Sequence, residues 1–265
     1  MRYFSIISAA AVIPSVDEAW AGEIPASMRR RDPRIWHMAH VAVARCIAKS
    51  QSHPASILTA TALGALDETK NFLDGIYSDG FGSPKNFIAS VHNGMAGKLS
   101  LDLKIPGPNL TLCDGPNSFA SAIAACECLY ASDFPVLVVA VDESVELLDR
   151  LSPHLSEPCR RVIAGSKREG AIAFILSDTL AGGYPRIGST GPLFIGNVKP
   201  DEAFNNNIPN AGGTPTVIMP TEAGGGFIAA AVGAFDFIAD PRRARTVIGS
   251  FSPSSKSISL IDLCP

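Results

Sequence analysis

Two unbroken apolar runs constrain the fold of this sequence more than any other feature. Phe134–Val141 and Gly170–Leu176 contain no charged residue, and the first run is rich in valine. A strand with one face in solvent alternates apolar and polar residues, whereas a continuous apolar run is typical of a strand covered on both faces. The sequence therefore predicts a sheet that lies between layers of helices.

Strand-like and helical segments alternate along the first 180 residues. In chain order, the predicted elements are a strand over Tyr3–Val12, a helix beginning at Asp32-Pro33, a strand over Ser56–Thr61, a helix over Leu66–Tyr77, a helix from Ser83-Pro84 past Gly97, a strand over Leu110–Cys113 and a helix over Asn117–Ala131. Asp32 is a preferred N-cap residue, and proline is favoured in the first helical turn. This alternation predicts an α/β domain with a mainly parallel or mixed sheet.

The composition changes after Asp178. Residues 182–216 are rich in glycine, proline and asparagine and show no sustained period, which predicts a long irregular connection. A helix over Glu222–Ala239 and strands over Thr246–Phe251 and Ser257–Leu263 are predicted to follow. This tail is too short for a core of its own, so we expect it to pack on the first 180 residues.

Composition narrows the class of protein. The 265 residues are 46% hydrophobic and 18% charged, with a net charge of −3. Proteins that bind nucleic acid usually carry a basic excess, so we expect no nucleic-acid partner. No apolar run reaches the roughly 18 residues typical of a membrane span, so we expect a soluble chain with a large core.

The N-terminus allows two interpretations. Arg2, the apolar stretch Tyr3–Ile13 and Ala19-Trp20-Ala21 are similar to a secretory signal with its cleavage site, which would favour a secreted binding protein. The other interpretation is a buried first strand that ends at a turn near Pro14. We favour the strand, because the predicted fold needs it in the mature chain, and we expect a cytoplasmic protein.

The cysteine pattern favours free thiols. The six cysteines are Cys46, Cys113, Cys126, Cys128, Cys159 and Cys264. No two of them form a C-x-x-C pair, so buried thiols in a reducing compartment are favoured over a disulfide framework. Cys126 and Cys128 are interpreted as small core residues of the predicted helix.

A strand, a tight turn and a small-residue helix follow one another over Asn109–Ala131. Several enzyme folds use this arrangement, the nucleophile elbow, to present a serine or cysteine for attack. The turn here consists of Gly115, Pro116 and Asn117. None of these three side chains has a nucleophilic atom, so the sequence predicts the architecture of an enzyme without its nucleophile.

Three polar residues beside the elbow could act as a nucleophile or as a helix cap. Cys113 is the nearest thiol, and we expect it to point into the sheet as a structural residue. Asp114 is interpreted as the N-cap of the helix, and Ser118 has no obvious histidine and acid partners for a hydrolase.

Other candidate groups carry weaker signals. His37 and His40 lie three residues apart on one helix face, but no third metal ligand matches them, so we expect a surface or interface face. His92 is interpreted as a packing residue. Arg29, Arg30 and Arg31 form a basic run that fits either a solvated, ion-paired loop or contact with an acidic carrier protein. No metal or cofactor is expected.

Several motifs, in this order, resemble those of β-ketoacyl synthases of the thiolase superfamily. The matching segments are Met28-Arg-Arg-Arg31, Thr61-Ala-Leu-Gly64, Ser83-Pro84, Ser90-Val-His-Asn93, Gly107-Pro108, the elbow, Ser132-Asp133 and Arg168-Glu-Gly170. The likeness covers about residues 1–180 and is greatest to short, chain-length-factor-like subunits of type II polyketide, aryl polyene and fatty acid systems. A looser likeness joins Thr221–Gly226 to the glycine-rich helix start after the family's second active-site histidine, and Gly249–Ser255 to its gatekeeper loop.

The resemblance implies a thiolase-like layered α/β fold, with helices packed on a mixed sheet and a strongly shortened C-terminal half. Residues 1–180 would form a ketosynthase N-terminal-like domain. Residues 181–265 would hold the irregular connection and a remnant of the second half packed on it.

The resemblance also implies that the family's chemistry is missing. In the family, an elbow cysteine is acylated by a carrier-protein thioester, and two histidines assist condensation. The cysteine position falls on Gly115 or Pro116, the second histidine position on Pro220, and the first histidine in a stretch that this chain lacks. This implies a non-catalytic subunit that pairs with a full-length ketosynthase and meets acyl carrier protein through that complex. The alternative is an active enzyme that uses Cys113.

Overall fold

The computed structural model describes residues 1–164, 169–209, 215–218, 228–240 and 242–265. Strands in these ranges are β1 (Tyr3–Val12), β2 (Ser56–Ala60), β3 (Asn109–Leu112), β4 (Val136–Asp142), β5 (Gly170–Ser177), β6 (Arg186–Ser189), β7 (Leu193–Phe194), β8 (Thr216–Ile218), β9 (Thr246–Ser252) and β10 (Ser257–Cys264). They form one sheet in the order β3-β2-β4-β5-β1-β6-β10-β9-β8, and β7 pairs with β10. Parallel β2, β3 and β4 lie beside antiparallel β5 and β1, which confirms the mixed sheet.

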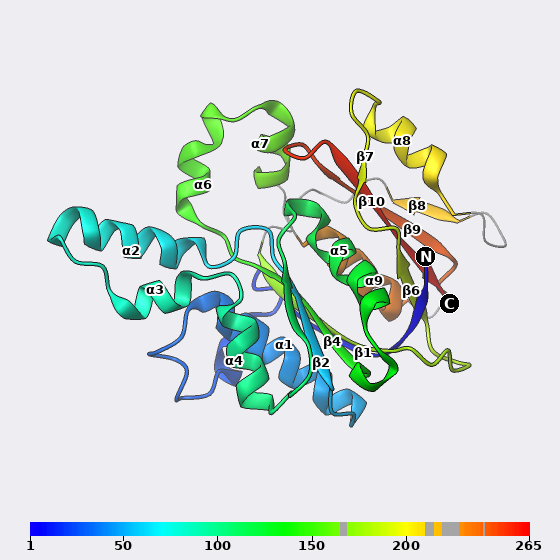
Figure 1. Ribbon diagram of the computed structural model, residues 1–265, viewed down its shortest axis with the longest axis horizontal. Helices are drawn as coiled ribbons and strands as arrows, with labels where there is room; N and C mark the ends of the chain where they lie inside the picture. The colour runs from blue at the N-terminus through cyan, green and yellow to red at the C-terminus, as the bar shows by residue number, and fades with distance from the viewer. Residues whose placement is uncertain (165–168, 210–214, 219–227, 241) are drawn as a thin grey trace.

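The helices lie in layers around this sheet. Their bounds are α1 (Arg34–Ser50), α2 (Leu66–Asp79), α3 (Pro84–Ser90), α4 (Gly94–Leu103), α5 (Ser118–Ala125), α6 (Glu146–Leu151), α7 (Glu157–Ala164), α8 (Pro200–Asn207) and α9 (Ala229–Ala239). Helix α1 packs on one face of β1, β4 and β5, and α8 packs on β10. The sheet has two halves, β3-β2-β4-β5-β1 and β10-β9-β8, which β6 connects. Helices α5 and α9 pack against each other, and both contact strands of each half (Figure 1). The arrangement is the layered α/β fold that the sequence predicted.

Strand β4 shows why its apolar run is unbroken. Every residue of β4 is buried. Val136, Val138 and Ala140 belong to the core around α5 and α9, whereas Leu137 and Val139 belong to the core under α1. Successive side chains of a strand point to opposite faces, so a strand between two helical layers needs apolar residues at every position.

Aromatic rings pack between the central helix α5 and the sheet. The rings of Phe119 on α5 and Phe174 on β5 stack with their centroids 5.2 Å apart. Both side chains are almost completely buried. A third, smaller core lies under α8 around Phe204 and Leu260.

The prediction of an irregular connection over 182–216 is wrong for much of its length. The segment contains β6, β7 and α8. Strand β6 pairs with β1 on one side and with β10 on the other, so it joins the two halves of the sheet. A four-residue strand is too short to produce a periodic pattern, and its partners are far away along the chain.

Three helix predictions also needed correction. The helix from Ser83-Pro84 is interrupted between Ser90 and Gly94, giving α3 and α4. The helix predicted to Ala131 ends at Ala125 and continues as a short 3-10 turn. Pro33 rather than Asp32 is the N-cap of α1, and no side chain caps that end.

The predicted first strand is confirmed. Strand β1 lies inside the sheet, paired with β5 and β6. Trp20 follows in a 3-10 helix over Glu18–Glu23, where its ring is buried. In the described part of the chain, no helix is both long enough and apolar enough to cross a lipid bilayer.

Candidate functional site

The elbow, residues 114–118, joins edge strand β3 to the central helix α5. After Leu112 the chain turns through a 3-10 helix over Gly115–Asn117 and enters α5 at Ser118. Gly115 has a φ of +53°, in the left-handed region that disfavours side chains. Among the described residues, a Cβ built on Gly115 would meet the Ser252 hydroxyl alone, at an ordinary 3.6 Å. The elbow thus has space for a side chain at Gly115, but the sequence places none there.

Ser118, and not Asp114, organises the start of the helix. The Ser118 hydroxyl accepts a hydrogen bond from the Asp114 amide at 2.8 Å, and it lies 2.7 Å from the Gly115 carbonyl and 3.0 Å from the Thr61 carbonyl. Asp114 is the N-cap residue of the 3-10 helix by position, as predicted, but its side chain makes no capping hydrogen bond. Its carboxylate accepts from Ser121 Oγ, and burial raises the pKa of Asp114.

Asn117 ties the elbow to the hairpin formed by β9 and β10. This side chain is fully buried. Its Oδ1 accepts from Ser250 Oγ at 2.7 Å, and its Nδ2 lies 3.0 Å from Ser257 Oγ and 3.3 Å from the Ser257 carbonyl. In the described part of the chain, no histidine hydrogen-bonds to the elbow, and the partners of the Asn117 side chain are two serine hydroxyls and a backbone carbonyl.

Cys113 does not lie where the sequence predicted. Its side chain is exposed, because β3 is at the edge of the sheet. The sulfur donates a hydrogen bond to the Ala62 carbonyl at 3.3 Å. Partial burial, Asp142 and Asp114 all raise the pKa of Cys113. A raised pKa favours the thiol over the reactive thiolate, which disfavours nucleophilic attack.

Asp142, at the end of β4, is a functional-site residue that sequence reasoning missed. Its fully buried carboxylate accepts from Thr61 Oγ1 at 2.9 Å, from the Ala62 amide at 2.9 Å and from the Leu63 amide at 2.9 Å. Burial raises the pKa of Asp142 to about 7. The sequence did carry one signal for this residue, because Asp142 follows directly after the apolar run Phe134–Val141. Asp142 fixes the loop after β2, and the Thr61 carbonyl of that loop contacts the elbow.

Glu143, the next residue, is also buried, with 5% of its side chain exposed. Burial, together with the nearby Asp67 and Glu68, raises the pKa of Glu143 to about 8. Within the described part of the chain, its Oε1 has no hydrogen-bond partner. Two neighbouring carboxyl groups at the end of β4 therefore lie in an environment that disfavours their charged forms.

The remaining predicted residues have structural surroundings. His37 is buried with Nε2 3.1 Å from the Met28 carbonyl, so its predicted surface position is wrong. Arg29 donates to the Ile24 and Gly22 carbonyls, which fits the structural interpretation of the basic run. The His92 ring packs against Gly64, so closely that a Cβ built on Gly64 would lie 2.7 Å from Cδ2 of the ring.

Two further outcomes concern the cysteines and the second histidine position. Cys126 is buried as predicted, whereas Cys128 is exposed. Pro220 and the Thr221–Gly226 motif lie outside the described residues. Among the residues that the structure does describe, no group of three histidine, cysteine or acidic side chains is arranged to hold a metal ion.

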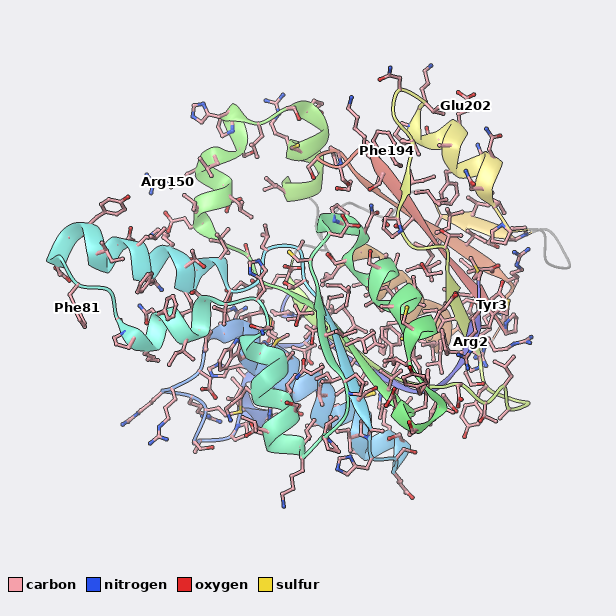
Figure 2. All side chains as sticks on the ribbon, viewed as in Figure 1. Arg2, Tyr3, Phe81, Arg150, Phe194 and Glu202 are labelled. Atoms are coloured by element: carbon pink, nitrogen blue, oxygen red, sulfur yellow. The ribbon has the colours of Figure 1, made fainter. Side chains whose placement is uncertain are left out.

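A protruding pair of helices forms a second candidate surface. Helices α2 and α3 with the turn between them, residues 66–90, are here called the arm. No residue of α2 is buried, and Ala89 is the one buried residue of α3. Exposed apolar side chains on and beside the arm are Leu73, Ile76, Tyr77, Phe81, Phe87, Ile88 and Val91. Figure 2 shows Phe81 at the outer end of the arm, far from the sheet.

Comparison with known proteins identifies the family. Residues 8–158, more than half of the chain, match the family model of the β-ketoacyl synthase N-terminal domain. The chain belongs to the β-ketoacyl synthase family. No curated protein sequence matches it.

Solved structures extend the likeness to the whole fold. A complex of a type II polyketide synthase acyl carrier protein with its ketosynthase bound to the hexaketide, AntDE:AntF, matches with a TM-score of 0.73 and 15% identity, covering 100% of this chain and 99% of that chain. The ketosynthase ApeO in complex with its chain length factor ApeC from Xenorhabdus doucetiae matches with a TM-score of 0.65 and 15% identity over 100% of both chains. The ishigamide ketosynthase/chain length factor matches with a TM-score of 0.71 and 13% identity over 99% of both. At these identities the likeness is one of fold, and it confirms the thiolase-like architecture.

Proposed function

We propose that this chain is a non-catalytic, chain-length-factor-like subunit that pairs with a full-length, active β-ketoacyl-ACP synthase. The partner's cysteine would perform the condensation, and acyl carrier protein would deliver the growing chain to the complex. This chain would contribute part of the wall of the acyl tunnel and so limit product length. The proposed setting is polyketide, aryl polyene or fatty acid biosynthesis in the cytoplasm.

The observation that carries the proposal is Gly115. A condensing enzyme of this family needs a nucleophile at the elbow, and Gly115 occupies the turn there without a side chain, with no described atom closer than 3.6 Å to the place of a Cβ. Pro116 and Asn117 offer no alternative, since Asn117 is committed to hydrogen bonds with the β9–β10 hairpin. Covalent attachment of an acyl group at the turn residues Gly115, Pro116 and Asn117 therefore has no nucleophilic atom, and the nearby Ser118 hydroxyl is hydrogen-bonded to the Thr61 and Gly115 carbonyls.

The exposed surfaces support a protein partner. Strand β3 is an edge strand of the sheet, and Leu110 on it is 43% exposed. The arm adds an apolar surface on which Tyr77 is 85% exposed. Contiguous exposed apolar side chains commonly mark protein interfaces, and an edge strand offers unpaired backbone groups for pairing. Two of the matched solved structures are ketosynthase and chain-length-factor pairs, which fits this interpretation.

A second candidate function is an active enzyme that uses Cys113. The exposure of Cys113 beside the elbow favours it, because a substrate could reach the sulfur. The raised pKa and the hydrogen bond to Ala62 argue against it. We therefore keep it as the rival that the experiment must exclude.

The test is co-expression with a full-length ketosynthase encoded beside this chain. Native mass would report the complex, and a carrier-dependent condensation assay would report turnover. We expect a heterodimer whose activity requires the partner's elbow cysteine and is unchanged by Cys113→Ala in this chain. Cys128→Ala, which removes another exposed thiol, is the matched control. Turnover by this chain alone, lost in Cys113→Ala and kept in Cys128→Ala, would establish the rival instead.

A further inference from the structure

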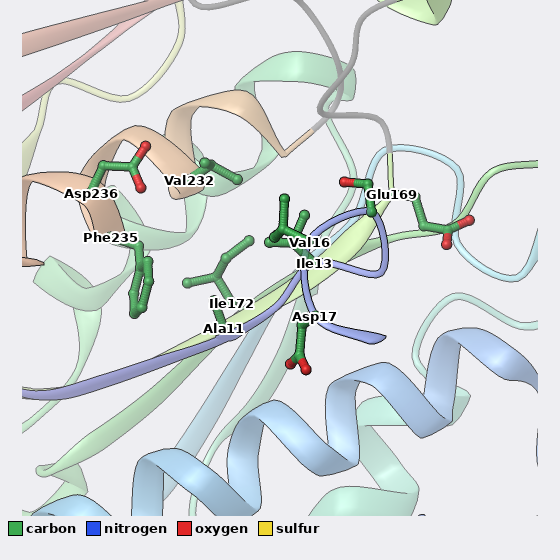
Figure 3. A pocket seen from close by; sticks show the side chains of 10 residues that line it. Ala11, Ile13, Val16, Asp17, Glu169, Ile172, Val232, Phe235 and Asp236 are labelled. Atoms are coloured by element: carbon green, nitrogen blue, oxygen red, sulfur yellow. The ribbon is translucent and has the colours of Figure 1, made fainter. Parts of the chain in front are cut away.

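A half-open cavity of about 460 Å³ lies beside the central layer and shares no lining residue with the elbow (Figure 3). Its walls come from the end of β1 and the following loop, from the start of β5 and from α9. The volume is within the range of about 300–1,000 Å³ that is typical of small-molecule sites.

The wall after β1 is fixed by hydrogen bonds. The amides of Val16 and Asp17 both donate to the Ile13 carbonyl at 2.9 Å. The Asp17 carboxylate pairs with Arg45 at 2.5 Å, and Figure 3 shows it pointing toward α1. Arg45 also donates to the Ala11 carbonyl. This loop is therefore held in one conformation against the sheet.

The wall before β5 is fixed in the same way. Glu169 pairs with Arg34 and accepts a hydrogen bond from the Ser144 amide at 3.0 Å. Gly170 leaves room for the neighbouring wall, since a Cβ there would lie 2.8 Å from Ile13 Cδ1. A cavity with two fixed walls is preformed, so a ligand that enters it orders little of the protein.

The floor of the cavity is apolar. Ala11, Ile13, Ile172, Val232 and Phe235 line it, and in Figure 3 the α9 side chains face Ile13 and Ile172 across the space. These residues belong to the inner core or pack against it. An apolar ligand group here would cover core surface that is otherwise open to water.

The charged side chains that the structure describes along the cavity are acidic. Its charged lining residues in the described part of the chain are Asp17, Glu169 and Asp236, and none is basic. Arg45 and Arg34 neutralise the first two. Asp236 is exposed and forms no ion pair within the described ranges. Among the residues that the structure describes, the uncompensated charge at the cavity is therefore the Asp236 carboxylate on α9.

We propose that this cavity binds a small amphiphile that combines an apolar chain or ring with one protonated amine. The apolar part would lie on the floor, and the ammonium group would lie near Asp236. A carboxylate or phosphate on the same apolar body would be disfavoured by the unpaired charge of Asp236. This inference does not depend on the proposed function.

The test compares three probes that share one apolar body: 4-phenylbutylamine, 4-phenylbutanol and 4-phenylbutyrate. Each is titrated at pH 7 into the full chain with isotope-labelled isoleucine and valine methyl groups. We expect saturable shifts at Ile13, Ile172 and Val232, with the amine bound most tightly and the carboxylate least tightly. A solvent-exposed ion pair is worth about 0.2–1 kcal/mol, which corresponds to about 1.4- to 5-fold in affinity.

Two variants separate the charge from the apolar floor. Asp236→Asn should remove the advantage of the amine over the alcohol, whereas Asp201→Asn on α8 should leave it unchanged. Phe235→Ala should weaken all three probes, and its thermal unfolding would show whether the fold is intact. Equal or tighter binding of the carboxylate, shifts confined to other methyl groups, or no saturable binding of the amine would each overturn the proposal.

Discussion

The elbow and the arm differ in whether their side chains have contacts within the chain. At the elbow, the polar groups of Asn117 and Ser118 are buried and paired within the chain. On the arm, large apolar side chains such as Tyr77 and Phe81 are exposed and have no cover. The first region is a turn whose polar side chains are bonded within the chain, while the second presents apolar side chains to the surroundings. The difference is the one that the proposed function requires: a structural elbow and an arm available to a partner.

The largest expected effect is on the loop beside the elbow. Asp142→Ala removes the acceptor of the Thr61 hydroxyl and of the Ala62 and Leu63 amides. Each buried donor left without a partner costs about 1–3 kcal/mol, so we expect the free energy of unfolding to fall by about 3 kcal/mol or more. Urea unfolding followed by circular dichroism measures it.

The matched control for Asp142 is on the arm. Asp79 is an exposed acid at the end of α2, and Asp79→Ala should change the unfolding free energy by less than about 0.5 kcal/mol. Equal losses in the two variants would mean that the elbow side is no better organised than the arm.

The next effect concerns the link between the elbow and the β9–β10 hairpin. Asn117→Ala leaves Ser250 and Ser257 without their buried partner, and we expect a loss of about 2 kcal/mol. Asn86→Ala on α3 is the control, because the Asn86 side chain forms no hydrogen bond within the described ranges, and we expect a change within about 0.5 kcal/mol. Thermal unfolding of both variants checks the difference, and an Asn117→Ala chain as stable as wild type would refute the link.

The third effect is a pH dependence at the end of β4. The folded-state pKa of Glu143 is raised to about 8, chiefly by burial and then by Asp67 and Glu68, while Arg34 lowers it. Between the ordinary pKa near 4.5 and about 8, the folded chain therefore binds more protons than the unfolded chain. Stability from this group is full below pH 4.5 and is lost as the pH rises through about 8.

Glu143→Gln isolates this contribution from the other titrating groups. The variant should gain stability relative to wild type as the pH rises from 5 to 8, by more than about 1 kcal/mol, since one pKa unit corresponds to about 1.4 kcal/mol. Asp142 has a raised pKa of the same sign and remains in both proteins. A stability difference between the two proteins that stays constant with pH would contradict the assignment.

Local patterns predicted the buried parts of the fold well. The strands β4 and β5 were predictable because a strand between two helical layers shows its burial at every residue. The strand, turn and helix around Gly115 were likewise predictable, since glycine and proline mark the turn locally.

What the sequence could not predict depends on distant contacts. Strand β6 is defined by pairing with β1 and β10, and four residues carry no period. The exposure of Cys113 follows from the edge position of β3, which no local pattern encodes. Asp142 accepts hydrogen bonds from a loop about 80 residues earlier, so its role appears only when the two segments meet.

The smallest effect on stability is expected on the arm, where it separates folding from assembly most sharply. Ile88 is 64% exposed on α3, so Ile88→Ser removes little buried surface and should change the unfolding free energy by less than about 0.5 kcal/mol. If the arm packs on a ketosynthase partner, the same change uncovers a buried apolar contact in the complex. An isoleucine side chain buried at an interface is worth about 1.5–3 kcal/mol, so association measured by native mass or calorimetry should weaken about tenfold or more. The exposed Lys85→Ser variant on the same helix is the control for a general surface effect. Unchanged association of Ile88→Ser would remove the arm from the interface and leave edge strand β3 as the surface to test.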